Sequence, residues 1–437
     1  MKHSGVPWLG DVPAEWEVVR VGRILTEINR RSDLGTEEPL SMSQKYGIVP
    51  SKMIDVANPA SSFIGAKIVS PGDIVLNKLK AHLGVFAISK FKGLVSPDYA
   101  VYRANEGVSA EYYNYVFHSP RCISEFRRRI TGVAVGFNRL YTSDLFKIEV
   151  PFPPLTEQRR IAAFLDGVVA KIDGIRDGIQ REIERLGDYR KSLVAEAVTG
   201  KRNSDSSDSL ANARQKRNVS GASDKSEFEK RPMKPSGIPW LGDVPAEWEL
   251  CKGKYFLRVV ERPVRDDDGV ITCFRDGEVT LRSKRREEGF TVALKEMGYQ
   301  GVEPGDLVVH GMDGFAGAIG VSDSRGKASP VLVVLDTDQN KRFVMYYLRS
   351  VAYKDVFAGL STGIRVRSCD LRWNKLANLP FLLPPLPEQR RIAAYLDKAT
   401  AQIDAAVEVR KGQLEKLEAL KKTIIAEYTT GKKEVLS

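Results

Sequence analysis

Apolar residues recur every three or four positions along residues 153–200 and 384–432, the spacing of an amphipathic helix. Both segments begin with Pro-Pro-Leu-x-Glu, where proline suits the first helical turn and the acidic residue suits the positive end of the helix dipole. Gly200 and Gly431 act as stop signals near the other end. The pattern therefore predicts two long helices, each about 60 Å in length at a rise of ~1.5 Å per residue.

The apolar positions of the two helices form narrow, matching stripes. In the first helix they are Ile161, Leu165, Val168, Ile172, Ile175, Ile179, Ile183, Leu186 and Leu193. In the second they are Ile392, Leu396, Ala399, Ile403, Val407, Leu414, Leu417 and Ile424. Because one such helix cannot bury its stripe alone, we expect the two to pair as an antiparallel coiled coil, rather straight because of an 11-residue step in each stripe. The alternative is that each helix packs on its own domain.

The chain contains the same unit twice. Ser4–Val18 returns almost unchanged as Ser236–Leu250, and Pro153–Asp166 returns as Pro384–Asp397. Shorter echoes are Thr199-Gly-Lys201 with Thr430-Gly-Lys432, and Pro71-Gly-Asp73 with Pro304-Gly-Asp306. The ends of the two units are alike and the middles differ, which indicates a shared scaffold that carries two different recognition surfaces.

The middles read mainly as short strands and turns, such as Ile74–Leu76, Leu307–Val309 and Val331–Leu335, with helical pieces at 109–129 and 340–358. The segment 201–235 is rich in serine and predicts a flexible linker. The expected class is α+β, in tandem units. The predicted domains are recognition domain 1 (1–152), spacer helix 1 (153–200), the linker (201–235), recognition domain 2 (236–383) and spacer helix 2 (384–432).

Composition points toward a polyanionic partner. The formal net charge is +11 and the sequence pI is about 9.3, and each cation set against a phosphate releases counterions. Because no stretch is apolar enough to cross a membrane and the N-terminus lacks a signal region, we expect a cytoplasmic protein. The four cysteines are scattered, so neither a disulfide framework nor a zinc site is expected.

Catalytic motifs were sought along the chain. No P-loop occurs, and Asn58-Pro-Ala60 is only a near miss to the Asn-Pro-Pro-aromatic motif of an adenine methyltransferase. Gly314–Gly320 lacks the spacing of a nucleotide loop and predicts a tight turn. The four histidines show no metal-ligand spacing. The sequence therefore predicts a non-catalytic chain without a metal site or cofactor of its own.

DNA contacts are expected on basic loops of the two middles. The candidates of the first unit are Lys78, Lys80, His82, Arg127, Arg128, Asn138, Arg139 and Tyr141, and those of the second are Arg282, Lys284, Arg285, Arg286, Arg365 and Arg367. Arginine suits guanine and asparagine suits adenine, whereas lysine and most of the arginines would contact phosphates. For a single residue, a solvated surface charge is the alternative. The set gains weight because both copies carry basic loops at what look like matching places.

The Pro-Trp-Leu-Gly-Asp-Val-Pro-x-x-Trp opening and the Pro-Pro-Leu-x-Glu-Gln-x-x-Ile-Ala-x-x-Leu-Asp helix start, each present twice, resemble specificity subunits of type I restriction-modification enzymes. The resemblance covers essentially the whole chain. It implies two target recognition domains, each reading half of a split site in double-stranded DNA. It also implies helices that set the gap and bind two methyltransferase subunits, with restriction/translocase subunits joining through these. S-adenosylmethionine, ATP and Mg²⁺ would then belong to the partner subunits.

Two other hypotheses stay open on the sequence. The chain could be a coiled-coil protein-interaction scaffold without sequence-specific DNA binding, or an enzyme whose motifs are disguised. DNA retention that falls steeply with salt while a sequence preference survives would favour DNA recognition over the scaffold.

Overall fold

The computed structural model describes residues 1–43, 46–54, 62–130, 139–202, 231–285, 297–354, 356–359 and 371–435. The chain divides into two compact units, Met1–Gln180 with Lys411–Ser437 (unit 1) and Arg181–Arg410 (unit 2). Helices account for 42% of the described residues and strands for 24%, so the mixed content expected from the sequence is confirmed.

Both predicted long helices are present: α5 (Leu155–Val198) and α10 (Leu386–Thr429), each 44 residues long. Unit 1 takes in the first part of α5 and the last part of α10, and unit 2 takes in the remainder of both helices. The stop signals act as predicted, because Gly200 (φ +69°) and Gly431 (φ +68°) adopt the left-handed conformation just beyond the last turns.

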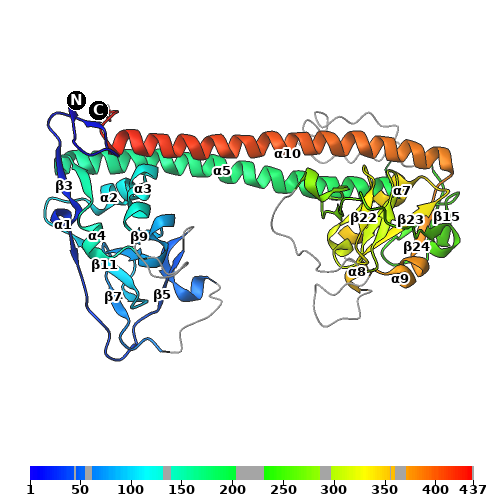
Figure 1. The fold of residues 1–437 in the computed structure, drawn as a ribbon, viewed down its shortest axis with the longest axis horizontal. Helices are drawn as coiled ribbons and strands as arrows, with labels where there is room; N and C mark the ends of the chain where they lie inside the picture. Colours follow the sequence, from blue (N-terminus) through cyan, green and yellow to red (C-terminus); the bar gives the residue numbers. More distant parts are fainter. Residues whose placement is uncertain are drawn as a thin grey trace. The chain divides into compact units, whose positions relative to one another are not determined.

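Unit 1 is built on a four-stranded antiparallel sheet in the order β4-β11-β8-β9. Its elements are β1 (Lys2–His3), β2 (Asp11–Val12), β3 (Glu17–Arg20), α1 (Val21–Ile24), β4 (Leu25–Glu27), β5 (Leu40–Ser43), β6 (Gly47–Pro50), η1 (Ser51–Met53), β7 (Lys67–Val69), β8 (Ile74–Asn77), η2 (Lys78–Leu83), β9 (Phe86–Ile88), β10 (Gly93–Val95), β11 (Tyr99–Ala104), α2 (Ala110–His118), α3 (Pro120–Arg129), α4 (Thr142–Leu145) and β12 (Glu149–Phe152). In Figure 1, α2 and α3 lie between this sheet and the long helices.

Unit 2 repeats the plan with a sheet in the order β16-β23-β20-β21. Its elements are β13 (Met233–Pro235), β14 (Asp243–Pro245), β15 (Glu249–Lys252), η4 (Gly253–Tyr255), β16 (Leu257–Val259), β17 (Ile271–Cys273), β18 (Val279–Leu281), η5 (Arg282–Lys284), β19 (Gln300–Val302), β20 (Leu307–His310), η6 (Gly314–Ala316), β21 (Ile319–Val321), β22 (Gly326–Ala328), β23 (Leu332–Thr337), α7 (Lys341–Tyr353), α8 (Val356–Gly359), α9 (Trp373–Asn378) and β24 (Pro380–Leu383).

The central strand of each sheet is buried on both faces. In unit 1, Ile74 and Leu76 of β8 join the core that contains the long helices, whereas Val75 points into a second core beneath the β5–β6 hairpin. In unit 2, Leu307 and Val308 of β20 divide between two cores in the same way. This burial explains the continuous aliphatic runs, because a strand with one solvated face would alternate apolar and polar residues.

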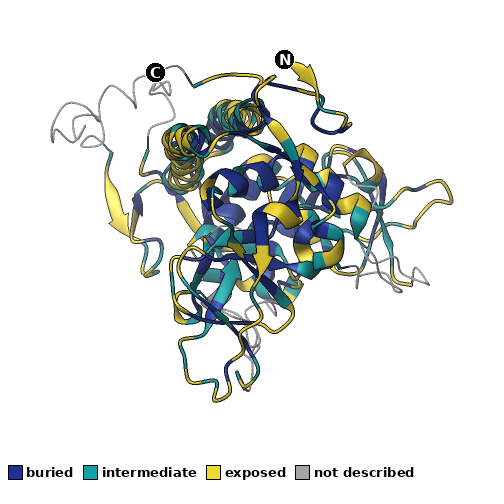
Figure 2. Ribbon diagram, turned by 90° about the vertical axis from the view of Figure 1, so that its left-hand side faces the viewer, coloured by how far each residue is buried: buried dark blue, intermediate teal, exposed yellow. Residues whose placement is uncertain are grey.

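Within each unit the long helices contact both the recognition domain and each other. In unit 1, Ile161 and Leu165 of α5 and Ile425 of α10 belong to one core. In unit 2, Leu193 of α5 and Leu396 of α10 do the same. Each long helix therefore packs on a recognition domain, as one of the two alternatives expected, and within each unit it also contacts the other long helix. Ile175 departs from the predicted stripe, since its side chain is 54% exposed. Figure 2 shows exposed residues along the outer faces of the long helices and buried residues in the domains beneath.

Candidate nucleic-acid interface

A buried tryptophan anchors each long helix to the start of its recognition domain. The indole Nε1 of Trp16 donates to Glu157 Oε2 at 3.0 Å, and Trp248 donates to Glu388 Oε2 at 3.1 Å. Both tryptophans are about 1% exposed, so each indole N–H needs this partner. The glutamate of the Pro-Pro-Leu-x-Glu start thus fixes the angle at which the domain meets the helix.

The glutamine that follows this glutamate connects the long helix to the start of a helix in the recognition domain, α2 in unit 1 and α7 in unit 2. Gln158 accepts from the backbone N–H of Ser109 at 2.8 Å and donates to Pro153 O at 2.8 Å. In unit 2, Gln389 accepts from Asn340 N at 3.0 Å and donates to Pro384 O at 2.8 Å. Both amides are fully buried, and losing either would leave buried backbone groups unpaired.

The Thr-Gly-Lys ends close each unit against the opening motif of the other sequence repeat. A Cβ on Gly200 would lie 2.3 Å from Pro245, and one on Gly431 would lie 2.4 Å from Pro13. The first helix therefore ends on the Pro-Ala-Glu-Trp turn of the second repeat, and the second helix ends on that of the first. Only glycine provides both the left-handed conformation and the close approach.

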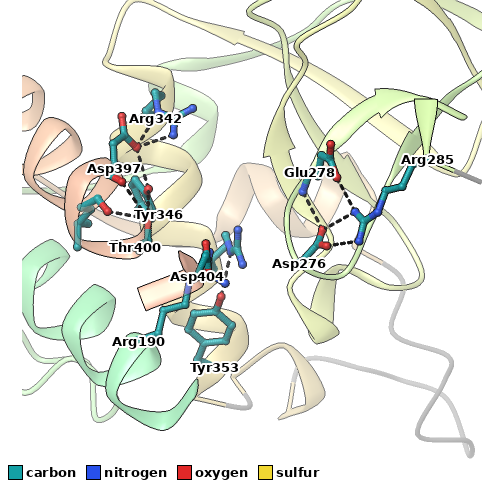
Figure 3. Close-up of polar contacts among 12 residues, drawn as sticks. Arg190, Asp276, Glu278, Arg285, Arg342, Tyr346, Tyr353, Asp397, Thr400 and Asp404 are labelled. Carbon is teal, nitrogen blue, oxygen red and sulfur yellow. Dashed lines mark hydrogen bonds and ion pairs between the residues drawn. The ribbon is translucent and has the colours of Figure 1, made fainter. Parts of the chain in front are cut away.

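A polar network ties α10 to α7 and α5 in unit 2 (Figure 3). Asp397 accepts from Arg342 Nε at 2.8 Å and from the Tyr346 hydroxyl at 2.8 Å. Arg190 of α5 pairs with Asp404 of α10 at 3.3 Å. Unit 1 keeps both features in its own residues: Tyr115 donates to Asp166 at 2.6 Å, and Lys421 pairs with Asp173 at 2.9 Å.

The predicted DNA-contacting residues of unit 1 come together around η2. Asn77 caps this short helix by accepting from Leu79 N and Lys80 N. Arg127 of α3 donates to His82 O at 3.1 Å, and Leu140 N donates to Lys78 O at 3.1 Å. Three segments far apart in the sequence, 78–82, 127–128 and 139–141, therefore form one basic surface, which we call the η2 surface.

The side chains of the η2 surface differ in exposure and in the partners that they already have. Lys80, Arg127 and Tyr141 are exposed, whereas Lys78 is half-buried. Arg128 pairs with Glu125 at 2.9 Å, and Arg139 contacts Asp98 at 3.5 Å. Burial lowers the pKa of the neighbouring Lys67, and the positive charge of Lys78 lowers it further although Glu27 opposes this. Such a concentration of positive charge suits a phosphate backbone.

The predicted residues of unit 2 that the structure describes, Arg282, Lys284 and Arg285, lie on or directly after η5, and their own domain already binds them. Figure 3 shows the contacts of Arg285. Arg285 bonds to Asp276 and Glu278, and its guanidinium stacks 4.2 Å from the Phe274 ring centre. The hydrogen bonds to Asp276 raise the pKa of Arg285. Lys284 donates to Ser324 at 2.7 Å and pairs with Asp323 at 3.4 Å. Arg282 donates to Thr272 at 3.3 Å.

The expectation that both copies place these basic loops at matching positions is wrong for 282–286. The 3₁₀ helix η5 follows β18 of the β17–β18 hairpin, as η1 follows β6 of the β5–β6 hairpin, so its counterpart is Ser51–Met53. The counterpart of η2 follows the central strand β20 and comprises residues 311–316. There Leu371 N donates to Gly311 O at 2.9 Å, as Leu140 N does to Lys78 O.

Sequence reasoning missed this loop because Gly-Met-Asp-Gly-Phe-Ala contains no basic residue. Met312 is exposed, and its neighbour Asp313 pairs with Arg275 at 2.9 Å. The repeated Pro-Gly-Asp, which precedes both central strands, would have located it. Four predicted residues, Asn138, Arg286, Arg365 and Arg367, lie outside the described residues.

Two further features concern metal binding and membrane insertion. Across the part of the chain that the structure describes, no cluster of three or more His, Cys, Asp or Glu side chains could hold a metal ion. Among the same residues, no helix is both long and apolar enough to cross a membrane.

Comparison with known proteins finds relatives along nearly the whole chain. Residues 13–185 match the family described as "Type I restriction modification DNA specificity domain". The chain is 24% identical to the type I restriction enzyme MjaVIII specificity subunit of Methanocaldococcus jannaschii, over 96% of this chain and 93% of that protein. It is 22% identical to the putative MjaX specificity subunit of the same organism, over 97% and 95%.

A solved structure supports the fold. A chain from "Structural basis underlying complex assembly and conformational transition of the type I R-M system" superposes with a TM-score of 0.64 at 17% identity, over 96% of this chain and 98% of that one. The superposition supports the fold, and the family match over residues 13–185 confirms the resemblance to type I specificity subunits. Along nearly its whole length the chain is similar to the M. jannaschii subunits.

Proposed function

We propose that this chain is the DNA sequence-recognition subunit of a type I restriction-modification complex, in which each unit reads one half of a bipartite target. The observation that carries the proposal is the contrast within the duplicated fold. The contacts that join helix to domain are the same in both units, whereas the loops after the central strands differ in charge and sequence. Pseudo-symmetric arms with different loops suit two different half-sites.

The proposal makes α5 and α10 an antiparallel coiled coil that sets the gap between half-sites. Contacts inside each unit support it. In unit 1 the rings of Phe164 and Tyr428 lie 4.5 Å apart, and in unit 2 Arg410 makes two hydrogen bonds to Glu182, at 2.7 and 3.1 Å. Exposed apolar side chains on the helices, such as Ile175 and Leu420, support docking of methyltransferase subunits.

The proposed subunit performs no catalysis itself. S-adenosylmethionine would bind to the two methyltransferase subunits, and ATP and Mg²⁺ would serve the restriction/translocase subunits that join them. The complex would act on double-stranded DNA in the cytoplasm.

Methylation mapping tests the proposal. The chain is co-expressed with its cognate methyltransferase subunit in a host without adenine methylation, and the DNA is sequenced with detection of modified bases. We expect a motif of two short half-sites around a fixed, unspecified gap. A continuous motif, or no methylation although the partner is demonstrably active, would contradict the proposal.

The alternative, a protein-interaction scaffold, predicts a different binding result. A scaffold would retain DNA weakly and without sequence preference at every salt concentration. A recognition subunit would lose DNA affinity steeply between low and moderate salt. It would still prefer duplexes that carry the motif found by methylation mapping over unrelated duplexes.

A further inference from the structure

Two recesses at matching positions of the two units have the same lining. The recess of unit 1 has a volume of about 340 Å³, and that of unit 2 about 300 Å³. In each, six lining positions come from the last turns of a long helix, namely Lys422, Thr423, Ala426, Glu427, Thr430 and Lys432 in α10 and just beyond it, and Lys191, Ser192, Ala195, Glu196, Thr199 and Lys201 in and after α5. The two members of each pair are separated by the same number of positions in the sequence. Only one pair, Thr423 and Ser192, differs in residue type.

A further cation completes each recess from a domain helix. In unit 1, Arg121 of α3 donates to Trp8 O at 3.4 Å, and in unit 2, Lys354 at the end of α7 donates to Trp240 O at 3.2 Å. Trp8 and Trp240 are the same position of the repeated opening motif. The two cations differ in type and come from segments without sequence similarity. Each is nevertheless bound to the equivalent backbone carbonyl of its own unit.

The cations of unit 2 are held close together without an acidic partner. Lys201 donates to Leu241 O at 3.0 Å, one residue from the carbonyl that binds Lys354. Burial lowers the pKa of Lys354, and the charge of Lys201 lowers it further. Among the described residues, neither Lys201 nor Lys354 forms an ion pair. The acidic residue of the same recess, Glu196, pairs instead with Arg202 at 3.3 Å. In unit 1, Glu427 is likewise engaged, by Lys433 at 2.8 Å. Two neighbouring like charges are stabilised when an anion binds between them.

We propose that each recess binds a carboxylate-bearing segment of a protein partner that docks in two copies, one in each unit. The lining favours a carboxylate on an acidic peptide over a DNA phosphate. Lys201 and Lys354 in unit 2, and Arg121 in unit 1, are each bound to a backbone carbonyl beside a recess of side-chain size. Tyr353 and Ala195 in unit 2, or Pro120 and Ala426 in unit 1, add apolar surface beside the cations. Because the lining is alike in both units while the recognition loops differ, both recesses fit the same partner.

This inference rests on the proposed function, which supplies such a partner in the methyltransferase subunit. It places an electrostatic contact of that subunit where each long helix ends on its recognition domain, rather than only along the helices.

Stoichiometry of the complex provides the test. In the full chain, unit 2 receives Lys201→Glu with Lys354→Glu, and unit 1 receives Arg121→Glu with Lys432→Glu. Mass measurement of the assembly with the cognate methyltransferase subunit should show two copies bound to the wild type, one copy to either pair variant and none to the combined variant, with affinity reduced about tenfold or more for each altered recess. Lys92→Glu with Lys252→Glu, exposed and outside both recesses, should still bind two copies.

A gentler variant protects the test against misfolding. Lys191 and Lys422 line the recesses but are exposed and make only surface ion pairs, so Lys191→Glu and Lys422→Glu should fold normally and weaken binding in the same direction. Zero-length carbodiimide coupling of the wild-type complex should join Lys201 and Lys432 to partner carboxylates.

The outcomes separate the two proposals. A wild-type chain that binds no methyltransferase subunit contradicts the proposed function. A wild type that binds two copies, with folded recess variants that bind equally well, overturns the inference alone. Loss of DNA affinity in these variants while two partner copies stay bound would assign the recesses to phosphates and also overturn it.

Discussion

Units 1 and 2 share their joints and differ in their recognition loops. Each joint consists of a tryptophan bound to a glutamate, a buried glutamine and a glycine set against a proline. The loop after the central strand, in contrast, is Lys-Leu-Lys-Ala-His in unit 1 and Gly-Met-Asp-Gly-Phe in unit 2. The comparison teaches that the geometry of the helix–domain contacts and the chemistry of the loops are carried by separate parts of one fold.

The turn before the central strand shows how a shared role can use different partners. Asp73 and Asp306 are both buried and both accept a backbone N–H at 2.9 Å, from Ser70 and Glu303. Asp73 pairs with Arg103 on β11, whereas Asp306 pairs with Arg262, which follows β16. Both units have the buried carboxylate, but the arginine that pairs with it comes from a different segment in each unit. A buried charge needs a partner, and the partner can come from more than one position.

Lengthening the spacer should have the largest effect. Seven residues of helix inserted at matched points of α5 and α10 add about 10 Å, or roughly three base pairs of duplex. We expect methylation of the original site to disappear and a motif with the same half-sites and a correspondingly longer gap to replace it. An unchanged gap, mapped by the same sequencing, would show that the helices do not set it.

Substituting the glycine at either joint should destabilise one unit selectively. Gly431→Val in unit 1 or Gly200→Val in unit 2 brings a side chain against proline in a left-handed conformation, which should cost about 2–4 kcal/mol of unfolding free energy. Hydrogen exchange resolved by peptide should show lost protection in the affected unit. Gly412→Ala and Gly187→Ala, in open space on the helices, should instead stabilise slightly.

Removing exposed cations should affect the two units unequally. Lys80→Ala and Arg127→Ala in unit 1 should each reduce the slope of log affinity against log salt by about 1, for any half-site sequence. Lys284→Ala and Arg285→Ala in unit 2 should change the slope less, because both side chains already bind carboxylates of their own domain. Equal changes in slope for the unit 1 and unit 2 variants would contradict this difference between the units. Salt titration of DNA binding measures them.

The smallest effect should be that acid weakens unit 1 through the half-buried His118. Burial against Phe86 lowers the pKa of His118 below its ordinary value of 6.5. The unfolded chain therefore takes up the proton first, so this contribution to stability is complete above pH 6.5 and decreases as pH falls below it. The urea midpoint of unit 1 should drop less between pH 7.5 and about pH 5.5 in His118→Gln than in the wild type. An equal drop would assign the acid sensitivity to other groups.

Local signals in the chain predicted much of this fold. The two long helices, their glycine ends and the central strands follow from apolar spacing and turn chemistry, which act between near neighbours, and from the internal repetition of the chain. The basic character of η2 was also visible, although its assembly with Arg127 and Arg139 was not. Matching of the recognition loops failed at 282–286, because similarity in charge was taken for similarity of position.

By itself, then, the sequence determined that one unit is written twice, where its helices begin and end, and which residues carry charge. Only the tertiary structure decided that each helix ends on the opening motif of the other repeat, and that Lys354 and Arg121 reach equivalent carbonyls, Trp240 O and Trp8 O, from unrelated segments. Those contacts join residues that are not neighbours in the sequence, such as Arg121 with Trp8 and Lys354 with Trp240, which lie 113 and 114 positions apart. Their partners are chosen by packing and by the need to satisfy buried polar groups, neither of which leaves a local pattern in the chain.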